Sequence, residues 1–240
     1  MRIAADHLVK RYGSKESVSD LSFTLEHNCI LGFIGPNGAG KTTTMRMLCG
    51  IMSPSSGQVF INGMELLADP VRAKQQIGYL PENAPLHGSM TVRSFLHYCA
   101  SMRGMGGKQR TFAMDRVMES CSLRTVADEE IEALSKGYRR RVCLAQSILH
   151  EPGILVLDEP TDGLDPNQKR EIRALIKTMR ERCAIIVSTH ILEEVDAVCD
   201  RVLTISAGRK VFDGDVAEFR AVSGGSLEDS FAKLAGEDGQ

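Results

Sequence analysis

Residues 35–42 read Gly35-Pro36-Asn37-Gly38-Ala39-Gly40-Lys41-Thr42 and match the template Gly-x-x-x-x-Gly-Lys-Ser/Thr at every fixed position. Glycines in such a loop let successive backbone N–H groups turn inward around a phosphate, because no Cβ obstructs them. Lys41 adds a positive charge for the β- and γ-phosphates, and the Thr42 hydroxyl is suited to binding Mg²⁺. The loop therefore predicts a site for a nucleoside triphosphate, with a glycine-rich turn that holds no ligand as the alternative.

The flanking residues predict a strand before this loop and a helix after it. Residues 29–34 (CILGFI) form an apolar run typical of a buried strand, and residues 43–48 (TTMRML) suit the start of a helix. A helix N-terminus behind the loop supplies further N–H donors and a favourable dipole for an anion. Thr43, at that start, is therefore counted among the predicted phosphate contacts.

A second nucleotide motif lies far downstream. Residues 154–159 read ILVLDE, four aliphatic residues followed by two acids. Such a run is typical of a central parallel strand buried on both faces, with its acids delivered at the carboxyl edge of the sheet, where α/β folds bind ligands. Asp158 would hold Mg²⁺, directly or through water, and Glu159 would orient and deprotonate the attacking water. The alternative, a strand that ends in solvated acids, is disfavoured by the phosphate loop.

Three further motifs follow a fixed order. Residues 134–138 read LSKGY, residues 160–166 read PTDGLDP, and the strand-like run 184–189 (AIIVST) ends at His190. In this order and spacing, from about residue 3 to about residue 215, the chain resembles the ATP-binding-cassette (ABC) ATPases. The resemblance implies an α/β fold: a P-loop NTPase (RecA-like) core with a parallel sheet, an N-terminal antiparallel β subdomain and an inserted helical subdomain.

The resemblance also implies a head-to-tail dimer with two ATP molecules between the subunits. Each ATP would contact the phosphate loop of one copy and Ser135 and Gly137 of the second copy, at the start of a helix. Asp165 would cross the interface to link the two sites. His190 would hydrogen-bond the γ-phosphate and position Glu159 and its water.

Tyr12, in the segment KRYG at residues 10–13, occupies the position where this family stacks an aromatic ring on adenine. A ring there supplies apolar and π contact without reading the edge of the base, so weak discrimination between ATP and GTP is expected. A tyrosine at a strand end before a turn is the alternative interpretation.

Two positions depart from the commonest pattern of the family. The family has glutamine after the strand that corresponds to residues 77–81, and this chain has Glu82 there, a carboxylate that can also ligate Mg²⁺ and is expected to alter the metal response. Lys136 and Tyr138 replace the glycine and glutamine of the signature Leu-Ser-Gly-Gly-Gln. Together with DPNQ at residues 165–168, they make the chain similar to exporter ATPases that include the gliding-motility-associated group.

Composition excludes some classes of function. The net charge of −2 gives no electrostatic footprint for nucleic acid, so no nucleic-acid partner is expected. The 7 cysteines are odd in number and contain no C-x-x-C pair, which favours reduced thiols in a cytosolic protein. No N-terminal signal segment is recognised, and no apolar run approaches the ~20 residues that span a bilayer.

The patterns predict one ATPase domain over residues 1–215, with the helical subdomain at about 84–150, and a short tail over 216–240. Strands over residues 3–34 predict the antiparallel part. Apolar residues at helical spacing in the subdomain are Val92, Phe95, Leu96 and Cys99, and, less regularly, Phe112, Val117 and Met118. Leu227, Phe231 and Leu234 predict an amphipathic tail helix that packs on the chain's own core.

Two classes of function fit. In the first, the chain is the nucleotide-binding subunit of an ABC transporter, by its subgroup an exporter, peripheral at the cytoplasmic face of the inner (plasma) membrane. It would drive integral membrane permease subunits that dock near residues 82–98. The apolar segment 84–90 would line that docking groove or instead seal the subdomain core. In the second class, the chain is a soluble ABC ATPase of macromolecular assembly or repair, which would generally carry a coiled-coil insertion, a second cassette or basic arms.

Overall fold

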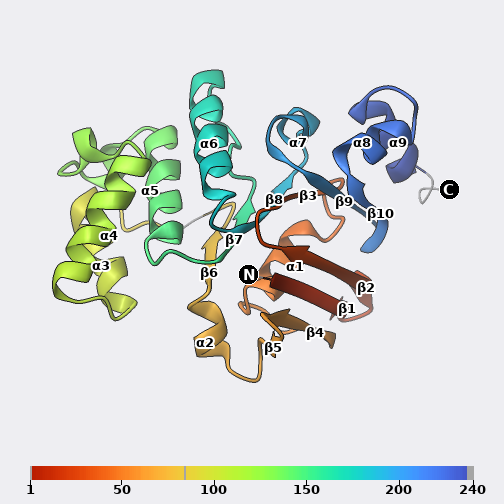
Figure 1. Ribbon diagram of the computed structural model, residues 1–240, viewed down its shortest axis with the longest axis horizontal. Helices are drawn as coiled ribbons and strands as arrows, with labels where there is room; N and C mark the ends of the chain where they lie inside the picture. The colour runs from red at the N-terminus through yellow and green to blue at the C-terminus, as the bar shows by residue number, and fades with distance from the viewer. Residues whose placement is uncertain (1, 84, 237–240) are drawn as a thin grey trace.

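The computed structural model describes residues 2–83 and 85–236, so residue 84, the first of the predicted helical subdomain, and the end of the predicted tail lie outside it. Helix α1 (Lys41–Leu48) lies between two β-sheets, and three longer helices form a group at one end of the molecule (Figure 1).

The larger sheet has six strands in the order β10-β9-β3-β8-β7-β6. The strands are β3 (Ile30–Ile34), β6 (Ile77–Leu80), β7 (Ile154–Asp158), β8 (Ala184–Thr189), β9 (Arg201–Ser206) and β10 (Arg209–Asp215). All pairs are parallel except β9 with β10. Every residue of β3, β7 and β8 is buried, which explains their continuous apolar runs. The three predicted central strands are therefore confirmed, whereas the β9–β10 hairpin was not predicted.

The smaller sheet is antiparallel, in the order β2-β1-β4-β5. Its strands are β1 (Arg2–Tyr12), β2 (Lys15–Glu26), β4 (Ser56–Ile61) and β5 (Met64–Glu65), and the short helix α2 (Pro70–Lys74) follows them. Inward-facing residues of β1 and β2, such as Ile3, Leu8 and Leu25, share one apolar core with Met45 of α1 and Ile186 of the central sheet. This shared core fixes the antiparallel sheet against the phosphate loop.

The helical group consists of α3 (Val92–Met102), α4 (Gly107–Ser120) and α5 (Lys136–Ile148), with short 3₁₀ turns at Arg124–Val126 and Ile131–Ala133. Val92, Phe95 and Leu96 are buried in its core, as the spacing predicted. The prediction for Phe112 is wrong, since this side chain is 70% exposed. Helix α4 buries Val117 and Met118, as predicted, together with Ala113 and Met114, and Phe112 lies outside that stripe.

The remaining helices cover the central sheet and its edge. They are α6 (Pro166–Met179), α7 (Leu192–Val198), α8 (Val216–Ala221) and α9 (Leu227–Gly236). Leu227, Phe231 and Leu234 of α9 pack with Phe219 of α8 and with the central sheet, so the tail helix lies on the chain's own core as predicted. Within residues 2–83 and 85–236, no helix has both the length and the apolar character needed to cross a membrane.

Candidate nucleotide site

The loop of residues 35–42 joins β3 to α1 at the carboxyl edge of the central sheet. Gly38 and Gly40 have φ angles of 81° and 104°, a region that L side chains rarely adopt. A Cβ on Gly40 would also lie 2.4 Å from the carbonyl oxygen of Ser17 in β2. Glycine is therefore required at position 40 both by the backbone conformation and by the close approach of β2.

Lys41 is the first residue of α1, and its side chain folds back over the loop. Its Nζ donates to the carbonyl oxygens of Gly35, at 2.6 Å, and Pro36, at 3.1 Å. Burial lowers the pKa of the ammonium group, and nearby carboxylates, Glu159 foremost, oppose that shift. The Lys41 ammonium group thus places a positive charge at the loop, and its hydrogen-bond acceptors there are backbone carbonyl oxygens.

A cavity of about 440 Å³ lies in front of this loop. Its lining residues are Lys15, Ser17, Asn37, Gly38, Gly40, Lys41, Thr42, Thr43, Glu82, Glu159, Asp162 and His190. Nine of these were predicted as site residues from the sequence. Gly35, Pro36 and Ala39 belong to the same loop without lining the cavity.

Lys15, Ser17 and Asp162 were not predicted as site residues. Lys15 and Ser17 come from β2, which Gly40 brings into contact with the loop. No local sequence pattern marks Lys15 and Ser17 as site residues, because the long-range packing of the smaller sheet against the larger one places them at the cavity. Asp162 had a signal, since it lies within the motif at residues 160–166.

Asp158 is fully buried at the end of β7. Its Oδ1 accepts a hydrogen bond from the Ser188 hydroxyl, whereas its Oδ2 has no partner among the described residues. A buried carboxylate oxygen without a partner is costly unless a ligand compensates it. Thr42 and Glu82 line the cavity together with Glu159, the residue after Asp158, and hydroxyl and carboxylate oxygens are the ligands that Mg²⁺ prefers. The donor set therefore fits a magnesium ion.

Glu159 and His190 contact each other across the ends of two neighbouring strands. Asp158 of β7 pairs with Ser188 of β8, and this register brings the following residues together. The Glu159 Oε1 lies 2.9 Å from the His190 Nδ1. The backbone at Glu159 has a positive φ of 49°, and its N–H donates to the carbonyl oxygen of Ser188 at 3.0 Å. The Glu159 carboxylate is thus aimed at the cavity by both strands.

The structure does not bring Tyr12 into the cavity lining. Its side chain lies at the end of β1 and is 47% exposed. The hydroxyl donates to the sulfur of Met52, and the Lys10 ammonium lies 5.5 Å from the ring centre. The adenine role of Tyr12 therefore stays a prediction.

Ser135, Gly137 and Asp165 also lie outside this cavity. Ser135 caps α5, where its hydroxyl accepts from the N–H of Tyr138, and Gly137 is buried against the side chain of Gln168. Asp165 caps α6 and accepts from two backbone N–H groups. All three residues stand at helix starts, which the sequence predicted for Ser135 and Gly137, and none of the three lines the cavity at the phosphate loop of its own chain.

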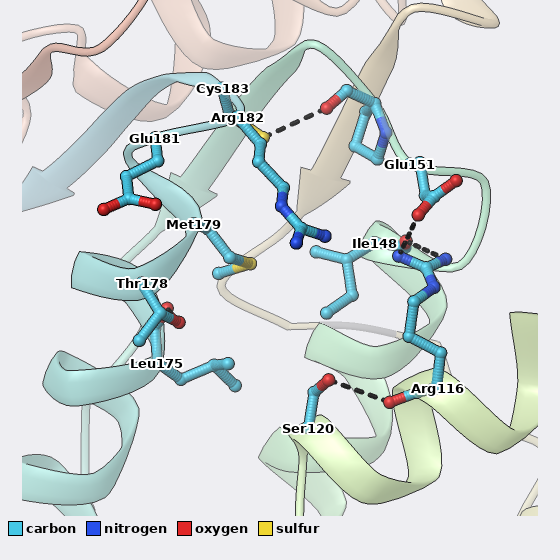
Figure 2. Close-up of a pocket in the computed structure, with 11 residues that line it drawn as sticks. Arg116, Ser120, Ile148, Glu151, Leu175, Thr178, Met179, Glu181, Arg182 and Cys183 are labelled. Carbon is cyan, nitrogen blue, oxygen red and sulfur yellow. Dashed lines mark hydrogen bonds and ion pairs between the residues drawn. The ribbon is translucent and has the colours of Figure 1, made fainter.

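A second hollow, the α4–α6 crevice, opens at the other end of the same strands (Figure 2). Its volume is about 390 Å³, and its lining residues are Arg116, Ser120, Ile148, Glu151, Pro152, Leu175, Thr178, Met179, Glu181, Arg182 and Cys183. Arg116 donates to the carbonyl oxygen of Leu149 at 2.9 Å and pairs with Glu151 at 3.0 Å. None of the predicted site residues lines this crevice.

The fold and the cavity at the phosphate loop define a P-loop nucleotide-binding protein. The sequence profile of the family described as "ABC transporter" matches residues 18–162, and the chain belongs to this family. A solved structure of an ATP binding subunit of an ABC transporter has a TM-score of 0.87 and 28% identity, over 98% of this chain and 99% of that one. The predicted fold class is therefore confirmed.

Two relatives illustrate the likeness in sequence. A protein of Escherichia coli named as a probable multidrug ABC transporter ATP-binding protein is 34% identical over 239 residues, which are 97% of this chain and 41% of that protein. The Nod factor export ATP-binding protein I of Burkholderia lata is 36% identical over 85% of this chain and 68% of its own length. The chain thus spans less than half of the length of the E. coli relative.

Proposed function

We propose that this chain is the nucleotide-binding subunit of an ABC exporter, which hydrolyses ATP between two copies of itself to drive transport through separate membrane subunits. The contact between Glu159 and His190 at the phosphate-loop cavity carries the proposal, because it places a general base beside a group that can orient it. The name of the Burkholderia lata relative, a Nod factor export protein, supports export. The narrower likeness to the gliding-motility-associated group stays a prediction.

In the proposed reaction, the loop backbone and Lys41 hold the β- and γ-phosphates. Thr42, Asp158 and Glu82 would hold Mg²⁺, whose charge neutralises phosphate oxygens. Glu159 accepts a proton from water while the water oxygen bonds to the γ-phosphorus and the bond to the ADP oxygen breaks. His190 holds the Glu159 carboxylate in place and reaches the γ-phosphate.

The site requires a second copy in this proposal, because Ser135 and Asp165 lie outside the cavity of their own chain. Ser135 is exposed at the start of α5, where free N–H groups and the helix dipole favour an anion. A head-to-tail partner would present this end to the γ-phosphate and exclude water from it. Asp165 would link the two sites, and Tyr12 would contact the base.

A docking surface for the membrane subunits is proposed near residues 82–98. Leu86 and Met90 pack against the helical core, so the segment partly seals the subdomain. An open hollow remains along α3, where its lining includes Met90, His97 and the 43% exposed Tyr98. Exposed aromatic and apolar side chains beside polar ones are typical of interaction sites. This surface would place the chain at the cytoplasmic face of the inner membrane.

Two measurements test the proposal. With ATP and Mg²⁺, the wild-type chain should release phosphate. Glu159→Gln should bind ATP, release phosphate far more slowly than the wild type, and run as a dimer in size-exclusion chromatography. A Glu159→Gln chain that stays monomeric at saturating ATP contradicts the composite site.

The second measurement is co-purification of the tagged chain from detergent-solubilised membranes of its host, with partners identified by mass spectrometry. A polytopic membrane protein in stoichiometric amount is expected. Soluble partners alone, with the chain absent from the membrane fraction, would favour the assembly or repair class instead.

A further inference from the structure

One arginine of α5, Arg140, donates all of its guanidinium N–H groups to backbone carbonyls. The acceptors are the carbonyl oxygens of Pro81, Glu82, Asp158, Glu159 and Pro160, at 2.5 to 3.1 Å. An arginine side chain has five N–H donors, so its hydrogen-bonding capacity is filled. The residue is 9% exposed, and none of its partners is a side chain.

These carbonyls belong to two segments that leave the central sheet side by side. The parallel pairing of β6 with β7 ends at Leu80 opposite Leu157. Residues 81–82 and 158–160 come directly after this last pair, so they lie beyond the hydrogen bonds of the ladder that join β6 to β7. Arg140 lies at this point and binds both segments, so its side chain continues the connection between them beyond the end of the ladder.

Both segments carry residues of the nucleotide cavity. The side chain of Glu82 faces the cavity from one, and the side chain of Glu159 faces it from the other. The Glu159 backbone adopts a left-handed conformation, which is unfavourable for a residue with a Cβ and persists only where its surroundings determine it. One of those determinants is the hydrogen bond from Arg140 to the Glu159 carbonyl oxygen.

The chemistry of this position favours arginine over other residues. A lysine has three N–H donors on one nitrogen, so it can satisfy at most three of the five carbonyl oxygens, whereas a guanidinium is a planar fork with five donors spread over three nitrogens. A neutral side chain of similar length would leave several buried carbonyl oxygens without donors. Burial lowers the pKa of Arg140, and the group nevertheless stays charged because arginine is protonated throughout the physiological range.

We propose that Arg140 is a positioning residue for ATP hydrolysis. It holds the backbone of Glu159 in a fixed relation to the segment that carries Glu82, and it thereby sets where the Glu159 carboxylate stands beside His190. Since Arg140 is on the same helix that Ser135 caps, a displacement of α5 is transmitted to Glu159 through this side chain. The inference rests on the proposed function, because it assigns to Arg140 an effect on a reaction that Glu159 performs.

The test compares Arg140→Lys with Arg139→Lys. Arg139 is the neighbouring residue, exposed, and its side chain has no hydrogen bond or ion pair within the described part of the chain. Arg140→Lys should lower kcat roughly 10- to 100-fold, since small misplacements of a catalytic group have effects of this size, and should change the KM for ATP less than about twofold. The phosphate loop is anchored on β3 and α1, so nucleotide binding should be preserved. Arg139→Lys should match the wild type.

A double-variant measurement separates positioning from a general structural defect. In the Glu159→Gln background, Arg140→Lys should cause no further loss of the residual hydrolysis, because Arg140 acts through the group that is already removed. An additive loss, or a rise in KM that accounts for the whole effect of Arg140→Lys, overturns the proposal. So does a kcat within twofold of the wild type.

If Arg140→Lys is not recovered in folded form, Arg140→Gln, which keeps two donors on a neutral side chain, takes its place. Loss of the folded state in both variants assigns Arg140 to stability and overturns the positioning role. A wild-type chain without ATPase activity would refute the proposed function itself. An active wild type with an equally active Arg140→Lys variant refutes the present inference alone.

Discussion

At the carboxyl ends of β7 and β8 the nucleotide cavity has a volume of about 440 Å³, and at their amino ends the α4–α6 crevice has about 390 Å³. The two hollows are therefore similar in size and are built on the same pair of strands. They differ in how the chain treats the charges in them. Asp158, which precedes Glu159 of the first hollow, is a buried carboxylate with no ion pair among the described residues and with one oxygen that lacks a partner. Arg116 at the second hollow also has a buried Nε without a partner, but its charge is paired with Glu151 and it binds a helix-end carbonyl.

The difference shows that size does not separate a ligand site from a gap in packing. Charges that the chain leaves uncompensated need a ligand, because an unpaired buried charge is costly. The wall of the crevice mixes polar side chains with apolar ones, of which Ile148, Leu175 and Met179 come from α5 and α6 (Figure 2). Ligands of parallel α/β sheets also bind outside the carboxyl ends of the strands. The reaction is therefore expected at the carboxyl ends of β7 and β8. Substitutions at their amino ends are expected to change only the stability of the fold.

The largest expected difference between the two ends of β7 and β8 is in the rate of ATP hydrolysis after one acidic side chain is neutralised at each end. Glu159→Gln should lower the rate of ATP hydrolysis roughly 10²- to 10⁴-fold, the range for removal of a general base, and should leave ATP binding intact. Glu181→Gln, at the crevice, should leave the rate unchanged, because this exposed side chain contacts no reacting group. Phosphate release with matched protein concentrations measures both. Comparable rates for the two variants would remove the distinction between the hollows.

A smaller effect is expected for the proposed magnesium ligand. Asp158→Asn should abolish the part of the ATP-induced rise in Tm that requires Mg²⁺, because a neutral amide replaces the buried carboxylate. For a ligand at a hundred times its Kd this linkage stabilises a protein by about 2.7 kcal/mol. Thermal unfolding with ATP, in Mg²⁺ and in EDTA, is the measurement.

Asp162→Asn is the matched control for this change, since Asp162 lines the same cavity, is exposed and pairs with Lys136. It should keep the Mg²⁺-dependent rise in Tm. An Asp158→Asn variant that keeps the rise as well would show that Asp158 does not hold the metal.

The nucleotide end was also the more predictable of the two from sequence. The strands β3, β7 and β8 are buried on both faces, so their sequences are nearly continuous apolar runs. The residues that follow two adjacent parallel strands lie close together, and this is the physical reason for the contact between Glu159 and His190 that the family resemblance implied. Lys41 and the glycines of residues 35–42 could be predicted because they stand at fixed positions of one short motif.

Other features depend on packing that no local pattern records. Arg140 lies within three consecutive arginines, which in sequence resemble a solvated charged face. Only the end of the β6–β7 ladder shows that it bridges two segments. Phe112 was misassigned because the apolar residues of α4 fit more than one helical face. The strand β10 and helix α8 contain few apolar residues, so neither stands out by its pattern.

A pH effect on stability is expected from the end of the strands that lacks the nucleotide. His150 follows α5, and its Nε2 lies 3.1 Å from the carbonyl oxygen of Ile77, the first residue of β6. Burial, with the charge of Arg103 adding to it, lowers the pKa of His150 to about 4 from the ordinary 6.5. The unfolded state therefore binds more protons between these values, so stability is full above pH 6.5 and is lost as pH falls towards 4.

Denaturant unfolding between pH 7.5 and 4 measures this effect. At about 1.4 kcal/mol per pKa unit, up to about 3 kcal/mol is lost across the window, and His150→Gln should be less pH-dependent by that amount. His97→Gln, which removes an exposed histidine of α3, should retain the pH dependence of the wild type. Equal slopes for wild type and His150→Gln would contradict a buried neutral imidazole.

The smallest effect is expected at the crevice itself. Arg116→Ala removes the ion pair with Glu151 and the donor to Leu149, so the free energy of unfolding should fall by about 1–2 kcal/mol. Arg182→Ala should change it little, because the Arg182 side chain has no hydrogen bond or ion pair to the residues that the structure describes. Both variants should hydrolyse ATP at the wild-type rate. If Arg116→Ala instead lowers kcat while remaining folded, a disturbance at the end of α5 reaches Arg140 and Glu159 along the helix, and the two hollows are then parts of one mechanical unit.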